Sequence, residues 1–337
     1  MADNPQTLSA ITSALAQTFP DKIRRQINRR AVLLSILAIN KGAGKNVPVD
    51  VEADGAIAEN FAEGAVVANF GSDALVPSVL PWGLYRSNFR VTNLAAAAAE
   101  SSSSPTDAHD LIGRGLDNSM AKLSSLINGD SYTGNGAGSL IAGLSGSMVR
   151  DDNTYAAIDR TVGANAYWKA SVFDSANSAI SFRTIRADGN AIYVKSGSRP
   201  DIAVCSPDVQ AAIKGLFDDG RRFDMDVSTA TRGVVRLENS AGVVAVEGIQ
   251  FIEDKDAVPG EIVYLNSAEV SVVVLPQAKN FADPLGAADD GFNTLMLAFH
   301  AYELGRVGSD RRMSVEAQLQ LRCERPNTLG RRSNIAT

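Results

Sequence analysis

The chain has 337 residues, of which 45% are hydrophobic, so it is long enough for more than one hydrophobic core. Its formal net charge is -6, which argues against a dedicated nucleic-acid-binding domain, since such domains are usually basic. No apolar run reaches the ~18 residues that a membrane span needs, and a secretory signal pattern is absent. The two cysteines, Cys205 and Cys323, are too few for a disulfide framework, so we expect a cytosolic product with reduced thiols.

The first forty residues begin with a polar stretch and continue into a helical pattern. We expect a helix over residues 21–40, basic in its first half and apolar in its second. The basic residues are Lys22, Arg24, Arg25, Arg29 and Arg30. Such a cluster is able to contact phosphate, or it forms a solvated face that pairs with acidic neighbours.

Alternating apolar residues predict strands at 46–52 and 85–91. The stretch between them lacks helical periodicity, and connections of about thirty residues are uncommon in compact domains and usually functional. We therefore predict a long projecting hairpin made by these two strands, whose exposed aromatic residues need a neighbouring subunit to bury them. The residues that this loop would present are Glu59, Phe61, Glu63, Phe70 and Trp82.

An alanine- and serine-rich lead-in, residues 95–104, precedes the clearest helical pattern of the chain. Pro105 suits the first turn, and apolar residues recur at helical spacing from Ala108 to Ile127. Asn128-Gly129 is typical of a helix end. A helix of about twenty-four residues is a rod roughly 36 Å long.

Two glycine-rich runs require a separate interpretation. Residues 134–146 and 42–45 both depart from the spacing of dinucleotide-binding and phosphate-binding loops. We interpret both as flexible joints, and we place a domain boundary at the end of the first run.

A mixed α/β pattern extends from residue 154 to about residue 276. Helices are expected over 180–195 and directly after Ser206, a predicted N-cap. Short apolar runs between turn residues predict strands at 202–205, 234–237, 243–246, 249–252, 262–265 and 270–275.

The end of the chain has the strictest pattern. From Met313 to Cys323 the odd positions are apolar and the even positions are polar, which predicts a strand with one buried and one solvated face. A second strand-like run ends at Glu303. Residues 305–312 are predicted to join the two strands as a loop longer than a tight turn.

Catalytic and metal-binding patterns are weak. Neither His109 nor His300 has a Cys or a carboxylate at metal-ligand spacing, and Asp224-Met225-Asp226 offers too few oxygen ligands for a calcium loop. We therefore predict no catalytic residue, no metal and no cofactor. A metal-dependent α/β enzyme that uses Asp224 and Asp226 is kept as an alternative.

Four stretches, in this order, resemble the HK97-like major capsid proteins of tailed bacteriophages. They are residues 58–64 through 80–83, the alanine-rich lead-in with the rod that ends at 126–129, residues 155–160 with Trp168, and residues 201–223 with 246–275. The resemblance extends over roughly residues 20–335 and implies an α+β fold of the HK97-like type.

The resemblance also implies a division of the chain and a role for each part. Its parts would be an N-terminal arm (1–45), an extended β-hairpin loop (46–92), a peripheral domain with a long spine helix (93–150), a mixed α/β axial domain (151–276), and closing strands that return to the peripheral domain (277–337). Pentamers and hexamers of such subunits form the icosahedral shell, or head, of the virion. This shell encloses double-stranded DNA and is assembled in the cytoplasm of a host bacterium.

By the same resemblance, the chain is a structural protein and not an enzyme. Its implied partners are further copies of itself, portal, scaffolding and decoration (cement) proteins, and DNA contacted without sequence specificity, with no membrane. The loop residues above and the basic residues Lys22, Arg24, Arg25, Arg29, Arg311 and Arg312 are the candidates for subunit contacts; the basic residues would meet acidic loops or DNA. An encapsulin-type shell, which has the same fold and a protein cargo, is the main alternative.

Overall fold

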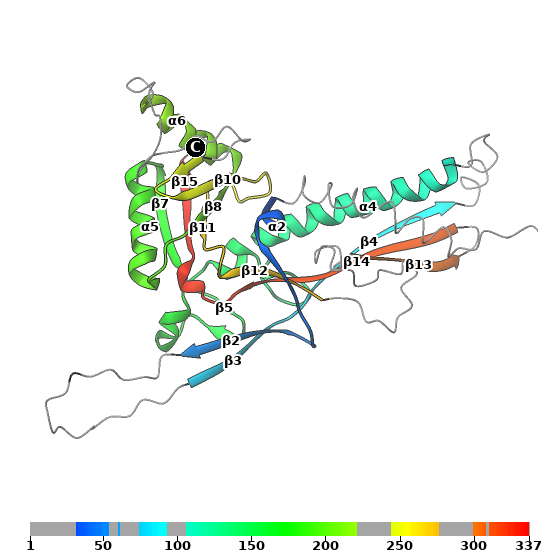
Figure 1. Cartoon of the computed structure of the whole chain (residues 1–337), viewed down its shortest axis with the longest axis horizontal. Helices are drawn as coiled ribbons and strands as arrows, with labels where there is room; N and C mark the ends of the chain where they lie inside the picture. Colours follow the sequence, from blue (N-terminus) through cyan, green and yellow to red (C-terminus); the bar gives the residue numbers. More distant parts are fainter. Residues whose placement is uncertain are drawn as a thin grey trace, which may run out of the picture.

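Two β-sheets organise the described part of this computed structural model, which comprises residues 32–53, 60, 74–92, 106–220, 244–275, 299–307 and 310–336. A long, five-stranded sheet extends to the right in Figure 1, and a six-stranded sheet stands at the upper left. One hydrophobic cluster contains side chains from both sheets. The two halves of the molecule are therefore joined by a continuous core.

The long sheet is built around strand β14 (Asp310–Cys323), which is paired on both edges. Strand β4 (Gly83–Thr92) runs antiparallel along one edge. Strands β13 (Phe299–Val307) and β12 (Val270–Val274) share the other edge, and β1 (Ala38–Lys41) adds a parallel partner to β12. The predicted terminal strand is thus confirmed as the centre of a sheet.

The alternation along β14 predicts its apolar face correctly and its polar face only in part. Fully buried residues at the odd positions are Val315, Ala317, Leu319, Leu321 and Cys323. Ser314 and Gln320, predicted to be solvated, are also 0% exposed. Gln320 is covered because its side chain accepts a hydrogen bond from the Ala142 N–H (2.8 Å) and donates one to the Pro81 carbonyl (2.6 Å).

The closing hairpin is tighter than the sequence predicted. Strand β13 continues to Val307 and β14 begins at Asp310, so most of the predicted loop at 305–312 is paired strand. The charged and glycine residues suggested a loop because they are uncommon in strands. A bulge between Glu303 and Gly305 accommodates the glycine within the ladder.

The predicted rod is helix α4 (Thr106–Thr133), which lies along β4 and the long sheet in Figure 1. One face of α4 packs into the shared core through Leu116, Met120, Leu123 and Ile127, as the helical spacing predicts. The helix continues past Asn128-Gly129, so the predicted end is wrong. Tertiary contacts override the stop signal, since Asn128 and Tyr132 are fully buried and hydrogen-bonded.

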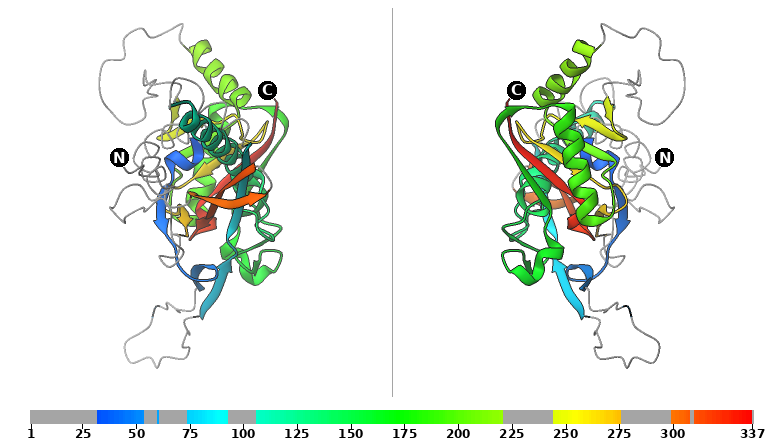
Figure 2. Two further views of the ribbon diagram at one scale, coloured as in Figure 1. Left: turned by 90° about the vertical axis from the view of Figure 1, so that its right-hand side faces the viewer. Right: turned by 90° about the vertical axis from the view of Figure 1, so that its left-hand side faces the viewer.

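The predicted hairpin exists, but its second strand is a different one. Strand β2 (Val47–Ala53) pairs with β3 (Ala74–Leu80) and not with 85–91. The predicted partner lies in β4 and pairs with β14 instead. In Figures 1 and 2 the β2–β3 ladder points down and away from the body of the molecule.

The predicted helix at 21–40 is also corrected at its C-terminal end. Its described part is the short α2 (Val32–Ile36), after which the chain enters β1. Pairing with the buried strand β12 favours the extended conformation for Ala38–Lys41. Leu33 and Leu34 of α2 are fully buried in the shared core.

The six-stranded sheet has helices over one face. Its order is β7 (Ser171–Ala179), β15 (Gly330–Ala336), β11 (Ile262–Leu265), β8 (Ile202–Cys205), β10 (Ile249–Glu253) and β9 (Val244–Val246). Helices α5 (Phe182–Ser196) and α6 (Pro207–Gly220) confirm the two predicted helices. The other face contributes Ile202 and Val204 to the shared core. Strand β7 was not predicted, and residues 234–237 lie outside the described residues.

The predicted cap of α6 does not form. The Ser206 hydroxyl has no hydrogen-bond partner, although the Ser206 carbonyl accepts from the Gln210 N–H at 3.0 Å. In α5, by contrast, the Ser181 hydroxyl accepts from the Thr184 N–H at 3.2 Å. That cap, which the sequence did not suggest, begins the helix.

Short elements connect the two sheets. They are the π-helix η1 (Leu144–Met148), strands β5 (Thr154–Tyr155) and β6 (Ile158–Asp159), and the 3-10 helices η2 (Gly163–Trp168) and η4 (Pro326–Thr328). The Arg160 guanidinium is fully buried among them, and its Nη1 donates to the carbonyls of Ser147, Met148 and Arg150. Burial lowers the pKa of Arg160 to about 10.

The two sheets exchange strands, so the predicted division of the chain fails at two places. Strand β12 was assigned to the axial part (151–276), yet it pairs with β14 in the long sheet. Strand β15 was assigned to the closing peripheral part (277–337), yet it pairs with β7 and β11. A bidentate pair from Arg332 of β15 to Asp188 of α5, which also accepts from Tyr264 (3.0 Å), holds the last strand in place.

The glycine-rich runs are tightly packed, so the prediction of flexible joints is wrong. A Cβ at Gly134 would overlap the carbonyl oxygen of Ile141, and one at Gly146 would overlap that of Thr133. At Gly42 a Cβ would lie 2.5 Å from a ring carbon of Trp82. These glycines are required because neighbouring backbone and side chains approach too closely for any larger residue.

We expect Gly134→Ala to destabilise the fold by about 1–3 kcal/mol, because the added methyl group overpacks a rigid backbone contact. The matched control is Gly129→Ala in α4, where a Cβ meets nothing within 4 Å. That change is expected to be neutral or stabilising by up to about 1 kcal/mol. Unfolding in guanidinium, followed by circular dichroism, measures both, and equal stabilities would contradict the close-packing interpretation.

Candidate assembly surfaces

The structure describes only some of the residues predicted to contact other subunits. Those that lie outside the described residues are Lys22, Arg24, Arg25, Arg29, Glu59, Phe61, Glu63 and Phe70. The backbone of Arg311 is placed in β14. Trp82 and Arg312 are described with their side chains, and these two differ in exposure.

Trp82 is buried within its own chain, so the prediction of an exposed aromatic residue is wrong for this position. Trp82 lies in the connection between β3 and β4, and the residue is only 8% exposed. The indole Nε1 donates a hydrogen bond to the Gly44 carbonyl at 3.1 Å. Because Gly42 leaves room for the ring, Trp82 fixes the base of the β2–β3 hairpin and offers little surface to a neighbouring subunit.

Arg312 belongs to a polar face of the long sheet. Residues directly opposite one another in an antiparallel pair share a face, and Arg312 pairs with Arg90 of β4, two residues from the pair of Ser314 and Asn88. Arg90, Arg312 and Asn88 are exposed. Arg86 continues this face with an ion pair to Glu316. We call Arg86, Asn88, Arg90 and Arg312 the basic face.

The opposite side of the same strands carries the rod. Phe89 of β4 lies against Gly115 of α4, where a Cβ would come within 2.6 Å of the ring. The basic face is therefore the side of β4 and β14 that is turned away from α4. Arg90 and Arg312 lie directly opposite each other on this face.

Sequence reasoning found Arg312 but not its partners on β4. Arg86, Asn88 and Arg90 occupy the even positions of a predicted strand. The pairing of β4 with β14, which are more than 200 residues apart in sequence, brings these arginines to Arg312. No local pattern reveals that register.

A metal or catalytic centre is not evident in the part of the chain that the structure describes. No group of three or more His, Cys, Asp or Glu side chains is arranged there to hold a metal ion. Asp224 and Asp226, the residues of the enzyme alternative, lie outside that part. Over the same residues, no helix combines the length and apolar character that crossing a bilayer requires.

The two thiols are buried on different elements. Cys205 ends β8 and Cys323 ends β14, and neither forms a disulfide. Burial raises the pKa of both thiols to about 12. Both cysteines therefore act as small apolar core residues at neutral pH.

Comparison with known proteins identifies the fold. No protein-family model and no curated protein sequence matches the chain. Among solved structures, the capsid of cyanophage A-1(L) is similar over 91% of this chain and 93% of its own, with a TM-score of 0.69 and 16% identity. The chain has the HK97-like capsid fold.

Other shells of this fold are similar to the chain at comparable coverage. The holo-SrpI encapsulin of Synechococcus elongatus PCC 7942 matches 92% of this chain and 89% of its own, with a TM-score of 0.60 and 12% identity. The capsid of a native GTA particle covers 91% of both chains, with a TM-score of 0.58 and 9% identity. A phage capsid, the capsid of a GTA particle and an encapsulin thus share the architecture described above.

The thiols provide a test of burial that depends on pH. A thiol reagent at pH 8 should leave Cys205 and Cys323 unmodified in the folded chain and modify both in denaturant, while the control Val194→Cys, at a residue 84% exposed, should react at once. Since the folded pKa values exceed the ordinary ~8.5, the thiols stabilise the fold below that pH, and this contribution is lost as the pH rises towards 12. Rapid modification at pH 8 contradicts the burial.

Proposed function

We propose that this chain is a major capsid protein that self-assembles through pentamers and hexamers into an icosahedral shell around double-stranded DNA. The observation that carries the proposal is the end-to-end likeness to the capsid of cyanophage A-1(L), which covers both chains almost completely. The role is structural. Its site of action would be the virion capsid, assembled in the cytoplasm of a host bacterium.

The strand directions favour contacts between copies. The β2–β3 hairpin points to the lower left in Figure 1, whereas the basic face lies on the strands that extend to the right. A shell of identical subunits allows weak contacts to add, because the same contact recurs between many pairs of neighbouring copies. We propose that the residues between β2 and β3 meet the long sheet of an adjacent copy.

Charge complementarity supports this arrangement. Residues 54–73 contain four acidic residues, Asp54, Glu59, Glu63 and Asp73, and no Lys or Arg. The basic face offers Arg90 and Arg312 as partners, and we propose Glu59 and Glu63 as the residues that meet them. Phe61 and Phe70 would add apolar contact area, since each aromatic side chain buries about 150 Å² or more.

The other basic residues and partners are part of the same proposal. Lys22, Arg24, Arg25, Arg29 and Arg311 are proposed to contact acidic surfaces of neighbours or the enclosed DNA. Portal, scaffolding and decoration proteins are further proposed partners. DNA contacts would be non-specific and salt-dependent, because phosphate neutralisation releases counterions.

A second candidate is an encapsulin-type shell. The likeness to the holo-SrpI encapsulin favours it, since that shell has the same fold at a TM-score of 0.60. It would hold a protein cargo in place of a genome. The metal-dependent enzyme has no comparable support, as the similar solved structures are shell proteins.

The proposal predicts that the full chain, expressed with or without a candidate scaffolding protein, forms closed shells or rings of five and six subunits. Size-exclusion chromatography with light scattering and electron microscopy measure this. Nuclease-protected DNA in particles from infected cells supports the capsid, whereas a co-purifying enzyme supports the encapsulin. A monomer of 35.5 kDa under all these conditions contradicts both shells.

A charge exchange tests the loop contact. Arg90→Glu with Arg312→Glu should abolish shells, as should Glu59→Lys with Glu63→Lys, because like charges then meet across the interface. The four changes together should restore assembly. The matched control, Lys122→Glu with Arg183→Glu, changes two exposed cations elsewhere and should assemble normally.

Loss of shells in both pairs without rescue contradicts the loop contact and favours arginines that face DNA. Normal shells from either double variant exclude the contact altogether. Circular dichroism and thermal unfolding of each variant show that the subunit still folds.

A further inference from the structure

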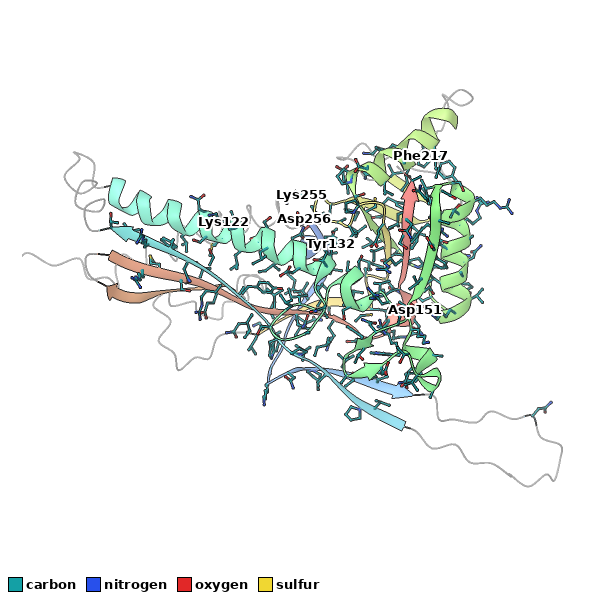
Figure 3. The ribbon with its side chains drawn as sticks, turned by 180° about the vertical axis from the view of Figure 1, so that it is seen from behind. Lys122, Tyr132, Asp151, Phe217, Lys255 and Asp256 are labelled. Carbon is teal, nitrogen blue, oxygen red and sulfur yellow. The ribbon has the colours of Figure 1, made fainter. Side chains whose placement is uncertain are left out.

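A buried carboxylate lies between the rod and the six-stranded sheet. Asp254 follows directly after strand β10 and is 1% exposed. Its side chain accepts hydrogen bonds from Asn128 Nδ2 (3.1 and 3.0 Å) and from the Tyr132 hydroxyl (2.8 Å), both on α4. Figure 3 shows Tyr132 at the end of the rod, near Lys255 and Asp256 of the turn that follows β10.

The two halves of this cluster are each held firmly in their own element. Asn128 and Tyr132 are one turn apart on α4, so they project from the same face of the helix. On the sheet side, the Asp254 N–H donates to the Cys205 carbonyl (3.1 Å), and the Asp256 N–H donates to Asp254 Oδ1 (3.0 Å). Asp256 Oδ2 also accepts from Asn128 Nδ2 at 2.7 Å.

The side-chain donors to Asp254 are the neutral groups of Asn128 and Tyr132. Among the described residues, no Lys or Arg forms an ion pair with it; Lys255 pairs with Asp256 instead. Burial, followed by the nearby charge of Asp254, raises the pKa of Tyr132 well above its ordinary value. Tyr132 therefore remains a donor over the whole physiological pH range.

The hydrogen bonds of this cluster are directional, whereas the apolar contacts around it are not. The core that joins the two halves consists of apolar side chains such as Leu123, Val204 and Leu265, and hydrophobic contact is non-directional. Hydrogen bonds to a charged group are short and geometrically specific. Leaving a buried carboxylate without its donors is costly, so small rotations of α4 against the six-stranded sheet are penalised.

We propose that Asp254, with Asn128 and Tyr132, locks the angle between α4 and the six-stranded sheet, and that this angle sets the curvature of the shell. The second half of the inference rests on the proposed capsid function. Closure of a symmetric assembly requires the same contact geometry in every copy. A subunit whose two halves rotate relative to one another closes into shells of mixed size.

The variants are chosen to remove donors or charge with little change in volume. Tyr132→Phe removes one hydroxyl, and Asp254→Asn removes the charge. The matched control is Tyr193→Phe on α5, which removes the hydroxyl of a tyrosine that is 47% exposed. Cooperative thermal unfolding of each full-length variant shows that it folds.

The first measurement does not need shells. Spin labels on Lys122→Cys of α4 and Val194→Cys of α5, both exposed, report the distance between the two halves, while the native thiols are buried. We expect one narrow distance distribution for the unaltered chain and for Tyr193→Phe. We expect a broadened or shifted distribution for Tyr132→Phe and Asp254→Asn; unchanged distributions in both would overturn the lock.

The second measurement is the distribution of particle diameters by electron microscopy. The ratio of normal to aberrant shells should fall about tenfold or more in Tyr132→Phe, because every subunit loses a hydrogen bond to a charged group. Broadened distances with shells of uniform size would overturn the link to curvature. If the unaltered chain forms no particles with or without a candidate scaffolding protein, the capsid function fails, while the distances still decide the lock.

Discussion

Burial of the apolar face of β14 is the interaction on which the rest of the structure depends. Five side chains of this strand are fully buried in the shared core, and both edges of the strand are paired. Strand β14 pairs with β4, β12 and the preceding β13, and β1 joins through β12. The strand thus gathers N-terminal, central and C-terminal segments into one sheet. At roughly 25 cal/mol per Å² of apolar surface, this burial is a large favourable contribution to folding.

Buried polar groups then select one arrangement of the elements around that core. Gln320 connects β14 to the glycine-rich segment and to Pro81. Asp188 accepts hydrogen bonds from Arg332 of the last strand, and Asp254 accepts one from Tyr132 at the end of α4. Removing one partner from any of these hydrogen bonds would leave the other buried and unsatisfied. The bonds therefore fix how the elements are oriented around the core, which apolar packing alone does not.

Two described surfaces are the ones that the proposed contact between copies would use. The basic face lies on the side of the long sheet away from α4, and the β2–β3 hairpin points away from it. Arg90 and Arg312 lie directly opposite one another on that face, and we propose that acidic residues of an adjacent copy meet them.

The sequence by itself determined the elements with strong local periodicity. The spacing of Leu116, Met120 and Ile127 revealed the rod, and the alternation along β14 revealed the closing strand, because each pattern reflects one buried face. The order of these elements was sufficient to suggest the HK97-like fold, which the solved capsids confirm.

Only the tertiary structure decided the partners of each element. From the sequence we predicted that residues 46–52 pair with 85–91 and that Trp82 is exposed. We also predicted that the rod ends at Asn128 and that Gly134 lies in a flexible joint. Each of these predictions relied on local signals alone. The features that decide these points join residues far apart in the chain. They are the register of the β2–β3 pair, the space that Gly42 leaves for the Trp82 indole, and the hydrogen bonds of the buried Asn128. The basic face was missed for the same reason, since β4 meets β14 only after folding.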